Sequence, residues 1–238
     1  MGFYDAIGAT YAATRIADPR IAAQIDAALG DAESVLNVGA GSGNYEPVNR
    51  AVIAVVPSRT MIDQRSTGAA PVVQAVAESL PFSDGHFDAA MGIFTIHHWT
   101  NPVRGLREVA RVSHRQVYLT YEPETVTGLW ILDYFPWVKD LPHERRALSA
   151  AQLSKLINVS DVQIVPIPKD CTDGFGGAFW ARPERYLEPG VQEGMSMLAV
   201  LDPALRDAGT AQLRRDLESG EWTRRYGHLL TFGALDLG

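Results

Sequence analysis

The chain has 238 residues, 46% of them hydrophobic and 21% charged, which predicts a soluble globular protein large enough to bury a full core. Its formal net charge of −7 argues against a nucleic-acid partner, because phosphate binding relies on clustered lysine and arginine. The single cysteine, Cys171, excludes an internal disulfide and a cysteine-based zinc site.

The beginning of the sequence, "MGFYDAIGAT", lacks the basic and apolar regions of a secretory signal. No apolar run approaches the length of a membrane span. These features predict a cytoplasmic protein without a membrane partner.

The first half of the chain alternates short apolar runs with helical stretches, as in a parallel sheet wrapped by helices. Strands are predicted at residues 33–39, 51–57, 70–77, 87–96 and 115–123. Helices are predicted at residues 19–30 and 101–112, the second with Pro102 just inside its start, where a missing N–H group costs nothing. The pattern indicates an α/β fold with a Rossmann-like, doubly wound, mostly parallel sheet and flanking helices.

After Pro123 the pattern changes. Residues 124–160 look helical and carry aromatic residues that we assign to core or lid packing, and "DVQIVPIP" at 161–168 predicts a sixth strand. Further helices are expected up to about residue 220, and "HLLTFGALDLG" at 228–238 is a candidate for a last strand. We therefore expect a core at residues 1–123 and, in the same domain, a helical C-terminal lid at residues 124–238 that also completes the sheet.

The most informative motif is "VLNVGAGSGNYE", in which an apolar strand runs into three alternating glycines followed by helix-compatible residues. Glycines at a strand tip let the backbone approach a ligand closely. The spacing is GxGxG, and not the GxGxxG of dinucleotide-binding enzymes. A tight turn without a ligand is the alternative.

Together with "YDAIGATYAATR", "AESLPFSDGHFDAA" and "FTIHHW", this motif resembles the class I S-adenosylmethionine-dependent methyltransferases, particularly the small-molecule, ubiquinone-biosynthesis-like group. The match covers about residues 3–122. It implies methyl transfer from S-adenosylmethionine to oxygen, nitrogen or carbon of a small-molecule acceptor, with S-adenosylhomocysteine as the product and no metal ion.

The resemblance also implies a set of cofactor-binding residues. The glycine loop would lie under the methionine and ribose parts, and Tyr11 and Arg15 are candidates for the cofactor carboxylate; a solvated arginine on an amphipathic helix is the alternative for Arg15. The other candidates are backbone groups near Glu78 and apolar contacts at the adenosine end. The full cofactor set is Tyr11, Arg15, Asn37, Gly39, Ala40, Gly41, Gly43, Val56, Pro57, Met61, Ala77, Glu78 and Phe94.

Three positions depart from the family pattern. Asn37 replaces an aspartate at the end of the first strand, Val56 replaces the acid that takes the ribose hydroxyls, and Val76 replaces an aspartate placed for the adenine. Losing two charge-assisted hydrogen bonds at the adenosine end would weaken binding by about 1.5–3 kcal/mol each. We therefore expect cofactor binding that is weaker than is usual in the family.

For the reacting end, the resemblance places the active site after the fourth strand. His97 is the candidate general base and Glu122 a second catalytic candidate, since histidine titrates near neutral pH. Packing or capping is the alternative for the histidines, and a turn residue for Glu122. Substrate contacts are expected from His98, Tyr121, Asp170, Asp173 and Phe175.

Two other functions remain open from the sequence. One is a methyltransferase fold that has lost methyl transfer, which Asn37, Val56 and Val76 would suit. The other is a nicotinamide-dependent oxidoreductase, which the glycine spacing and Val56 disfavour.

Overall fold

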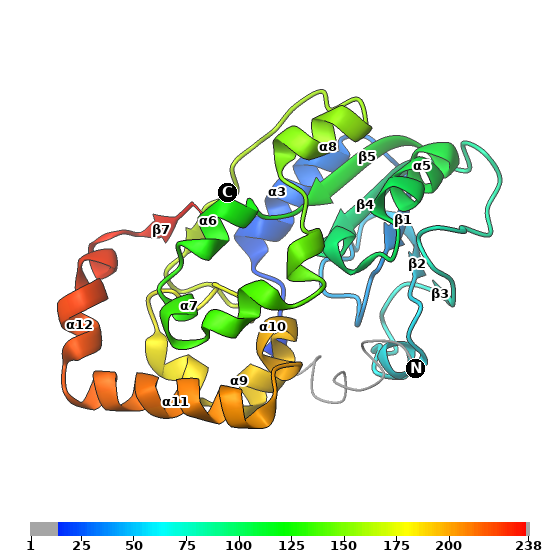
Figure 1. Ribbon diagram of the computed structural model, residues 1–238. Coiled ribbons are helices and arrows are strands. Elements are labelled where there is room, and N and C mark those ends of the chain that lie inside the picture. Colours follow the sequence, from blue (N-terminus) through cyan, green and yellow to red (C-terminus); the bar gives the residue numbers. More distant parts are fainter. Residues whose placement is uncertain (1–13, 237–238) are drawn as a thin grey trace.

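The computed structural model describes residues 14–236, and these form a five-stranded parallel sheet with helices around it (Figure 1). The strand order is β3-β2-β1-β4-β5. The strands are β1 (Ser34–Val38), β2 (Ala51–Val55), β3 (Val72–Val73), β4 (Phe87–Ile93) and β5 (Ser113–Leu119). All four pairings are parallel, which confirms the predicted Rossmann-like sheet.

The two central strands are buried because both faces of the sheet are covered. Val35 pairs with Ala89, and both belong to the core cluster that includes the buried face of α3 (Pro19–Leu29). Their neighbours Leu36 and Ala90 point the other way, into the cluster formed with α5 (Pro102–Val112). Alternate residues of a strand thus pack against different helices, as expected for a parallel sheet buried on both faces.

The connection from β1 to β2 differs from the sequence expectation. Helix-compatible residues follow the glycines, but residues 39–50 form turns and contain no helix. The next helix is the short α4 (Arg59–Asp63), capped by Ser58. Only twelve residues separate the two strands, the minimum length of a parallel crossover.

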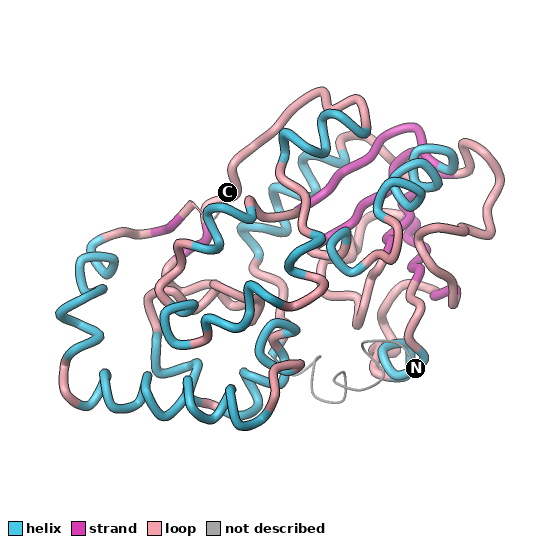
Figure 2. Tube along the Cα trace, viewed as in Figure 1, coloured by secondary structure: helices cyan, strands magenta, loops and turns pink. Residues whose placement is uncertain are grey.

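The second half of the chain is mainly helical, and apart from α8, which lies near β5, its helices gather on one side of the sheet (Figures 1 and 2). Most of these helices are short, and α11 is the longest. The helices are α6 (Pro123–Thr127), α7 (Ile131–Tyr134), α8 (Ala150–Leu156), α9 (Pro189–Gly194), α10 (Ser196–Ala199), α11 (Pro203–Glu218) and α12 (Glu221–Tyr226). Short 3-10 helices join them: η3 (Pro136–Asp140), η4 (Glu144–Arg146), η5 (Pro183–Leu187) and η6 (Gly227–Thr231).

This helical half has its own apolar cluster. Trp130, Tyr186 and Trp222 are buried in it, and the Trp130 indole donates to the backbone oxygen of Trp180 at 2.9 Å. The aromatic residues of the 124–160 stretch therefore serve packing, as the sequence analysis assigned them. The boundary at residue 123 remains a prediction.

The predicted sixth strand is wrong over most of its length. Of residues 161–168, only Ile167–Pro168 form a strand, β6, and it pairs antiparallel with β7 (Ala234–Leu235) in a separate two-stranded sheet. Pro166 and Pro168 lack the N–H groups that a longer ladder needs. Within residues 14–236, β5 therefore pairs only with β4. None of the described helices has the length and apolar character needed to cross a bilayer.

Candidate functional site

The glycine loop lies at the carboxyl end of β1 and packs against the tip of β4. Gly39, Gly41 and Gly43 all have positive φ angles, of 73°, 54° and 95°. A Cβ atom on Gly39 would lie 2.0 Å from Oγ1 of Thr95, so no larger residue fits there. The backbone N–H groups of Gly39 and Ala40 both donate to the oxygen of Val55, at 2.8 and 3.1 Å. The loop is thus fixed between two strand tips.

A buried ion pair, which the sequence analysis did not predict, supports this loop from one side. Arg65 donates to Glu46 Oε1 at 2.6 Å and to the backbone oxygen of Gly41 at 3.1 Å. The side chains of Arg65 and Glu46 are only 4% and 8% exposed. Asn37 donates its Nδ2 to Glu46 Oε1 at 3.4 Å. An aspartate at position 37 would repel Glu46, which explains why asparagine stands here.

The tip of β2 is apolar and covered. Val56 is only 2% exposed, whereas the following residue, Pro57, is exposed. Val76, the other departure at the adenosine end, is 46% exposed. The covered tip of β2 thus carries one aliphatic side chain, and Val76 is a second, exposed one.

The remaining candidates for the adenosine end differ from one another in environment. Met61 and Ala77 are buried. The carboxylate of Glu78 accepts the backbone N–H of Asn101 at 2.8 Å, so this side chain fixes the start of α5. A role of the Glu78 backbone in cofactor binding stays a prediction.

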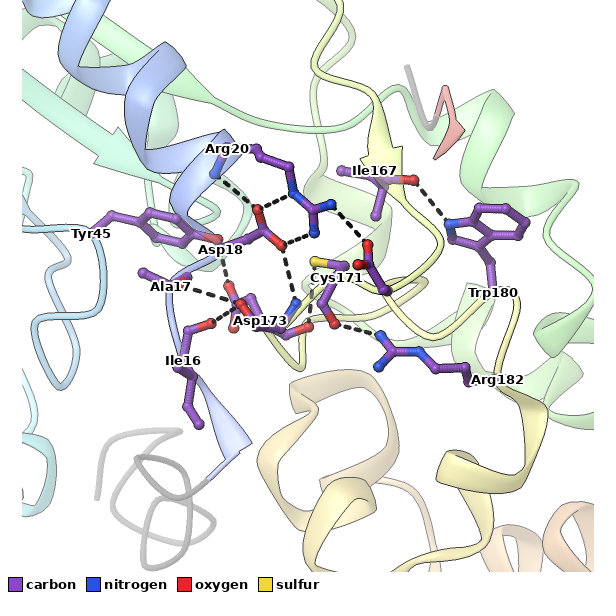
Figure 3. Close-up of polar contacts among 12 residues, drawn as sticks. Ile16, Ala17, Asp18, Arg20, Tyr45, Ile167, Cys171, Asp173, Trp180 and Arg182 are labelled. Atoms are coloured by element: carbon purple, nitrogen blue, oxygen red, sulfur yellow. Dashed lines mark hydrogen bonds and ion pairs between the residues drawn. The ribbon is translucent and has the colours of Figure 1, made fainter. Parts of the chain in front are cut away.

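Arg15 is held by a carboxylate that is remote in sequence. Its Nε and Nη2 atoms donate to Oδ1 and Oδ2 of Asp173, at 2.6 and 3.1 Å, and the Tyr45 hydroxyl donates to the same carboxylate at 2.9 Å. Asp173 is fully buried (Figure 3). The structure therefore assigns Asp173 to Arg15 and not to a substrate, because no part of it faces the cavity. Tyr11 lies outside the described residues.

A second ion pair joins the same two segments. Arg20 donates to Asp18 at 2.7 Å and to Asp170 at 2.8 Å, and Asp18 also accepts the backbone N–H of Thr172 at 3.1 Å (Figure 3). The Arg20 guanidinium holds the pKa of Asp18 far below its usual value. Asp170 thus faces solvent and Arg20, away from the cavity, contrary to its predicted substrate contact. We call residues 15–20 and 170–173 with these contacts the N-terminal ion-pair cluster.

Cys171 lies within this cluster and is fully buried. Burial raises the pKa of its thiol to about 12, so the thiol stays protonated. In the described part of the chain, no group of three or more His, Cys, Asp or Glu residues is arranged to hold a metal ion.

A cavity of about 290 Å³ opens beside β5. Its walls come from the ends of β4 and β5, from α6 to α8, and from residues 157–165, 175–176 and 195–197. Seven predicted site residues line it: Arg15, Phe94, His97, His98, Tyr121, Glu122 and Phe175. The lining does not include the glycine loop, Asn37, Val56, Pro57, Met61, Ala77, Glu78, Asp170 or Asp173.

Phe94 stands at the point where the glycine loop and the cavity meet. It has a φ angle of 48°, the only positive φ of a non-glycine residue in the described chain, and such strain concentrates at functional sites. Its ring lies 4.7 Å from that of Phe175. The adjacent Thr95 contacts Gly39, whereas Phe94, His97 and His98 face the cavity. Residues 94–98 therefore separate the loop from the cavity and contact both.

Three histidines cluster beside the cavity and are called the three-histidine wall; His97 and His98 are in the cavity lining, whereas His143 is not. The rings of His97 and His98 are 3.9 Å apart, and His143, from the helical half, lies 5.2 Å from His98. His97 is 5% exposed, and its Nδ1 atom has no hydrogen-bond partner among residues 14–236. Burial lowers the pKa of His97 to about 4 and the pKa of His98 also falls well below its usual value. Both imidazoles are therefore neutral at physiological pH.

Glu144 is the charged member of this wall, and the sequence analysis missed it. The Tyr121 hydroxyl donates to Glu144 Oε2 at 2.7 Å, and His143 Nε2 lies 3.4 Å from Oε1. Burial alone would raise the pKa of Glu144, but the adjacent His143 and the hydrogen bond from Tyr121 outweigh it and keep the pKa low. The "PHER" sequence gave no periodic signal that would have singled it out.

Glu122, the second catalytic candidate, has a structural partner. Its Oε1 atom accepts the backbone N–H of Ala150, the first residue of α8, at 2.6 Å. It thus fastens α8, which forms part of the cavity wall, to the end of β5.

Comparisons with known proteins agree with this geometry. Residues 36–121 match the family described as "Methyltransferase domain". An uncharacterized methyltransferase of Bacillus subtilis, YcgJ, is 34% identical over 89 residues, covering 33% of this chain and 35% of that protein. The ubiquinone/menaquinone biosynthesis C-methyltransferase UbiE of Geobacter sp. (strain M21) is 29% identical over 132 residues, covering 48% and 56%. The chain thus matches about a third and about half of the length of these two relatives.

Solved structures extend the likeness to nearly the whole chain. A crystal structure from Anabaena variabilis, described as a putative methyltransferase from an antibiotic biosynthesis pathway, has a TM-score of 0.87 and 29% identity. The alignment covers 94% of this chain and 96% of that one. The YcgJ structure, at a TM-score of 0.50 and 23% identity, shares the fold. The helical half is therefore common to this chain and the Anabaena protein.

Proposed function

Because the chain belongs to the class I S-adenosylmethionine-dependent methyltransferases, we propose that it methylates a small, largely apolar acceptor held in the cavity beside β5. The observation that carries the proposal is the position of residues 94–98. They contact the glycine loop through Thr95 and the cavity through Phe94, His97 and His98. A cofactor on the loop and an acceptor in the cavity would therefore meet at this segment.

The residues at the methionine end fit the cofactor. The glycine loop offers a backbone surface with few and small side chains at the tip of β1, the position at which nucleotide-like ligands bind in such sheets. Arg15 is held by Asp173, and Tyr45, which follows the glycine loop in the sequence, donates to the same carboxylate. When bound, S-adenosylmethionine supplies an electrophilic methyl group. At the adenosine end the chain offers the apolar Val56, Met61 and Ala77, so binding there relies on packing and on backbone groups.

The lining of the cavity supports an acceptor that is apolar over most of its length. Leu129, Leu132, Leu153 and Val165 contribute aliphatic surface. The cavity follows β5 from Gln116 to Leu119 and beyond, which is about 10 Å of strand at the usual rise per residue. This shape favours an elongated acceptor over a compact polar one.

Within this site we assign proton transfer to His97 and a positioning role to Glu122. His97 is neutral, buried and without a partner for its Nδ1 atom among residues 14–236, so it is free to accept a proton. Glu122 already accepts the Ala150 N–H group. His98 and Tyr121 would contact the acceptor beside His97.

One other function has an observation in its favour. The tip of β2 is apolar, and the Asn37 side chain is hydrogen-bonded to Glu46. Both features favour a protein that keeps the methyltransferase fold but has lost methyl transfer. A nicotinamide-dependent oxidoreductase has no such support.

Isothermal titration calorimetry with S-adenosylmethionine, S-adenosylhomocysteine and NADPH distinguishes these functions. We expect both sulfur ligands to bind and NADPH not to bind. No binding of either sulfur ligand at millimolar concentration would overturn the proposal. Binding without methyl transfer to any member of a panel of apolar hydroxyl, amine and carbon acceptors would favour the protein that has lost the reaction.

A further inference from the structure

Resting on the proposed function, we propose that Glu144 is a positioning residue that stabilises a proton on His97, and that the acceptor is therefore a hydroxyl compound that is methylated on oxygen. The carboxylate comes from η4 in the helical half, whereas His97 follows β4 in the sheet. The reacting wall is thus assembled from both halves of the chain.

The contacts of Glu144 show how it is oriented. The Tyr121 hydroxyl fixes Oε2 at 2.7 Å, and Oε1 lies 3.4 Å from His143 Nε2. The Tyr121 ring lies 5.2 Å from the His97 ring, edge to face. Glu144 is 15% exposed at its side chain, so water screens its charge only weakly. A fixed carboxylate in this position favours the imidazolium form of His97.

Some charged and titratable groups near His97 raise its pKa and others lower it. The charge of Glu144 raises the pKa of His97 and that of a protonated His143 lowers it, while burial is the largest effect. The groups that face the three-histidine wall from the packed elements are His98, Tyr121, His143, Glu144, Arg15 and Arg146. Glu144 is the one carboxylate among them, so it alone offsets the cost of a positive charge on His97.

The chemistry of the acceptor follows from this arrangement. When a hydroxyl oxygen forms a bond to the methyl carbon, the carbon–sulfur bond breaks with its electron pair on sulfur, and the hydroxyl proton must leave. In an apolar cavity, water does not take that proton readily, and His97 Nδ1 is the acceptor at hand. A neutral amine already carries a free lone pair and needs no base as it reacts. The base and its carboxylate therefore favour a phenol or alcohol.

The test uses 4-nitrophenol, whose ionised form has a distinct absorbance band, and 4-nitroaniline as a matched probe without a hydroxyl proton. Both are titrated into the full-length chain, with and without S-adenosylhomocysteine, below the pH at which free 4-nitrophenol ionises. We expect 4-nitrophenol to bind and part of it to show the ionised band, because the hydrogen-bonded pair of phenolate and protonated His97 offsets the low proton affinity that His97 has in the empty site. Glu144→Gln should lower the ionisation equilibrium of the bound probe about tenfold, and His97→Asn should abolish the band.

Two variants separate charge from structure. Glu144→Asp keeps the charge and should restore most of the ionised band. Glu124→Gln, at an exposed position on α6 outside the cavity lining, should behave as the wild type. The inference would be overturned by an equal ionised band in the wild type and Glu144→Gln, or by an absence of 4-nitrophenol binding at millimolar concentration. It would also be overturned if Glu144→Asp lost the band as completely as Glu144→Gln. Absence of S-adenosylhomocysteine binding would overturn the proposed function instead, since the probe titration without it is independent.

Discussion

Arg15 and Asp173, 158 positions apart in the sequence, form a bidentate ion pair, with Nε to Oδ1 at 2.6 Å and Nη2 to Oδ2 at 3.1 Å. The Arg15 side chain is 10% exposed and the Asp173 side chain is fully buried. This pair ties the segment before α3 to the loop after β6. It also places a cation in the wall of the cavity.

Asp173→Ala is therefore expected to lower the free energy of unfolding by about 3–5 kcal/mol, because it removes the buried carboxylate that pairs with the Arg15 guanidinium and accepts the Tyr45 hydroxyl. The matched control is Asp170→Ala, since Asp170 is 72% exposed at its side chain and pairs with the half-exposed Arg20. The control should change the free energy of unfolding by less than about 1 kcal/mol. Urea unfolding measures both, and equal losses would contradict the assignment of Asp173 to a buried pair.

Gly39→Ala tests whether the glycine loop must approach Thr95. The added Cβ would lie 2.0 Å from Oγ1 of Thr95, at a φ angle of 73° that alanine adopts only with strain. We expect the free energy of unfolding to fall by about 1–3 kcal/mol and the affinity for S-adenosylhomocysteine to fall at least about tenfold.

The control for this variant is Gly68→Ala, because an added Cβ there meets no atom within 4 Å. It should leave both stability and affinity close to the wild type. If Gly39→Ala folds and binds S-adenosylhomocysteine as the wild type does in calorimetry, the loop is not part of the cofactor site.

Val56→Asp tests the position that departs most from the family pattern. Val56 is 2% exposed, so an aspartate there should lower the free energy of unfolding of the unliganded protein by about 1–3 kcal/mol. If the ribose lies beside it, saturating S-adenosylhomocysteine should restore part of this loss by pairing with the carboxylate. Val48→Asp, at a fully exposed position, should have little effect with or without the ligand. An identical loss in both states of Val56→Asp would show that position 56 does not face the ribose.

The sequence predicted the sheet well because its signals are local. The apolar runs of β1, β2, β4 and β5 are bounded by glycine or proline, and Asn101 and Pro102 mark the start of α5. The sixth strand failed at Pro166 and Pro168, where proline removes hydrogen-bond donors from an otherwise strand-like pattern.

The site was predicted only in part because its key contacts are remote in sequence. His97, His98, Tyr121 and Phe175 do line the cavity. Asp173 looked like a substrate ligand because nothing nearby in the sequence shows that Arg15 takes it. In the same way, Asn37 is explained by Glu46 and its partner Arg65, contacts that appear only when the chain is folded. His143 and Glu144 likewise join the three-histidine wall only in the folded chain.

The burial of His97 also predicts how stability depends on pH. The unfolded chain binds a proton at His97 below about pH 6.5, whereas the folded protein does so only below about pH 4, because burial lowers the pKa. Between these values the unfolded state binds more protons, so the free energy of unfolding falls as the pH falls. The contribution is fully present above pH 6.5, and about 2 kcal/mol of it is lost between pH 7.5 and pH 5. His98, whose pKa is lowered as well, acts in the same direction.

Urea unfolding at the two pH values should show a smaller loss of unfolding free energy in His97→Asn than in the wild type. His228→Asn, at an exposed position, should lose as much unfolding free energy as the wild type. Equal losses in all three proteins would mean that His97 titrates normally and is not buried as a neutral base.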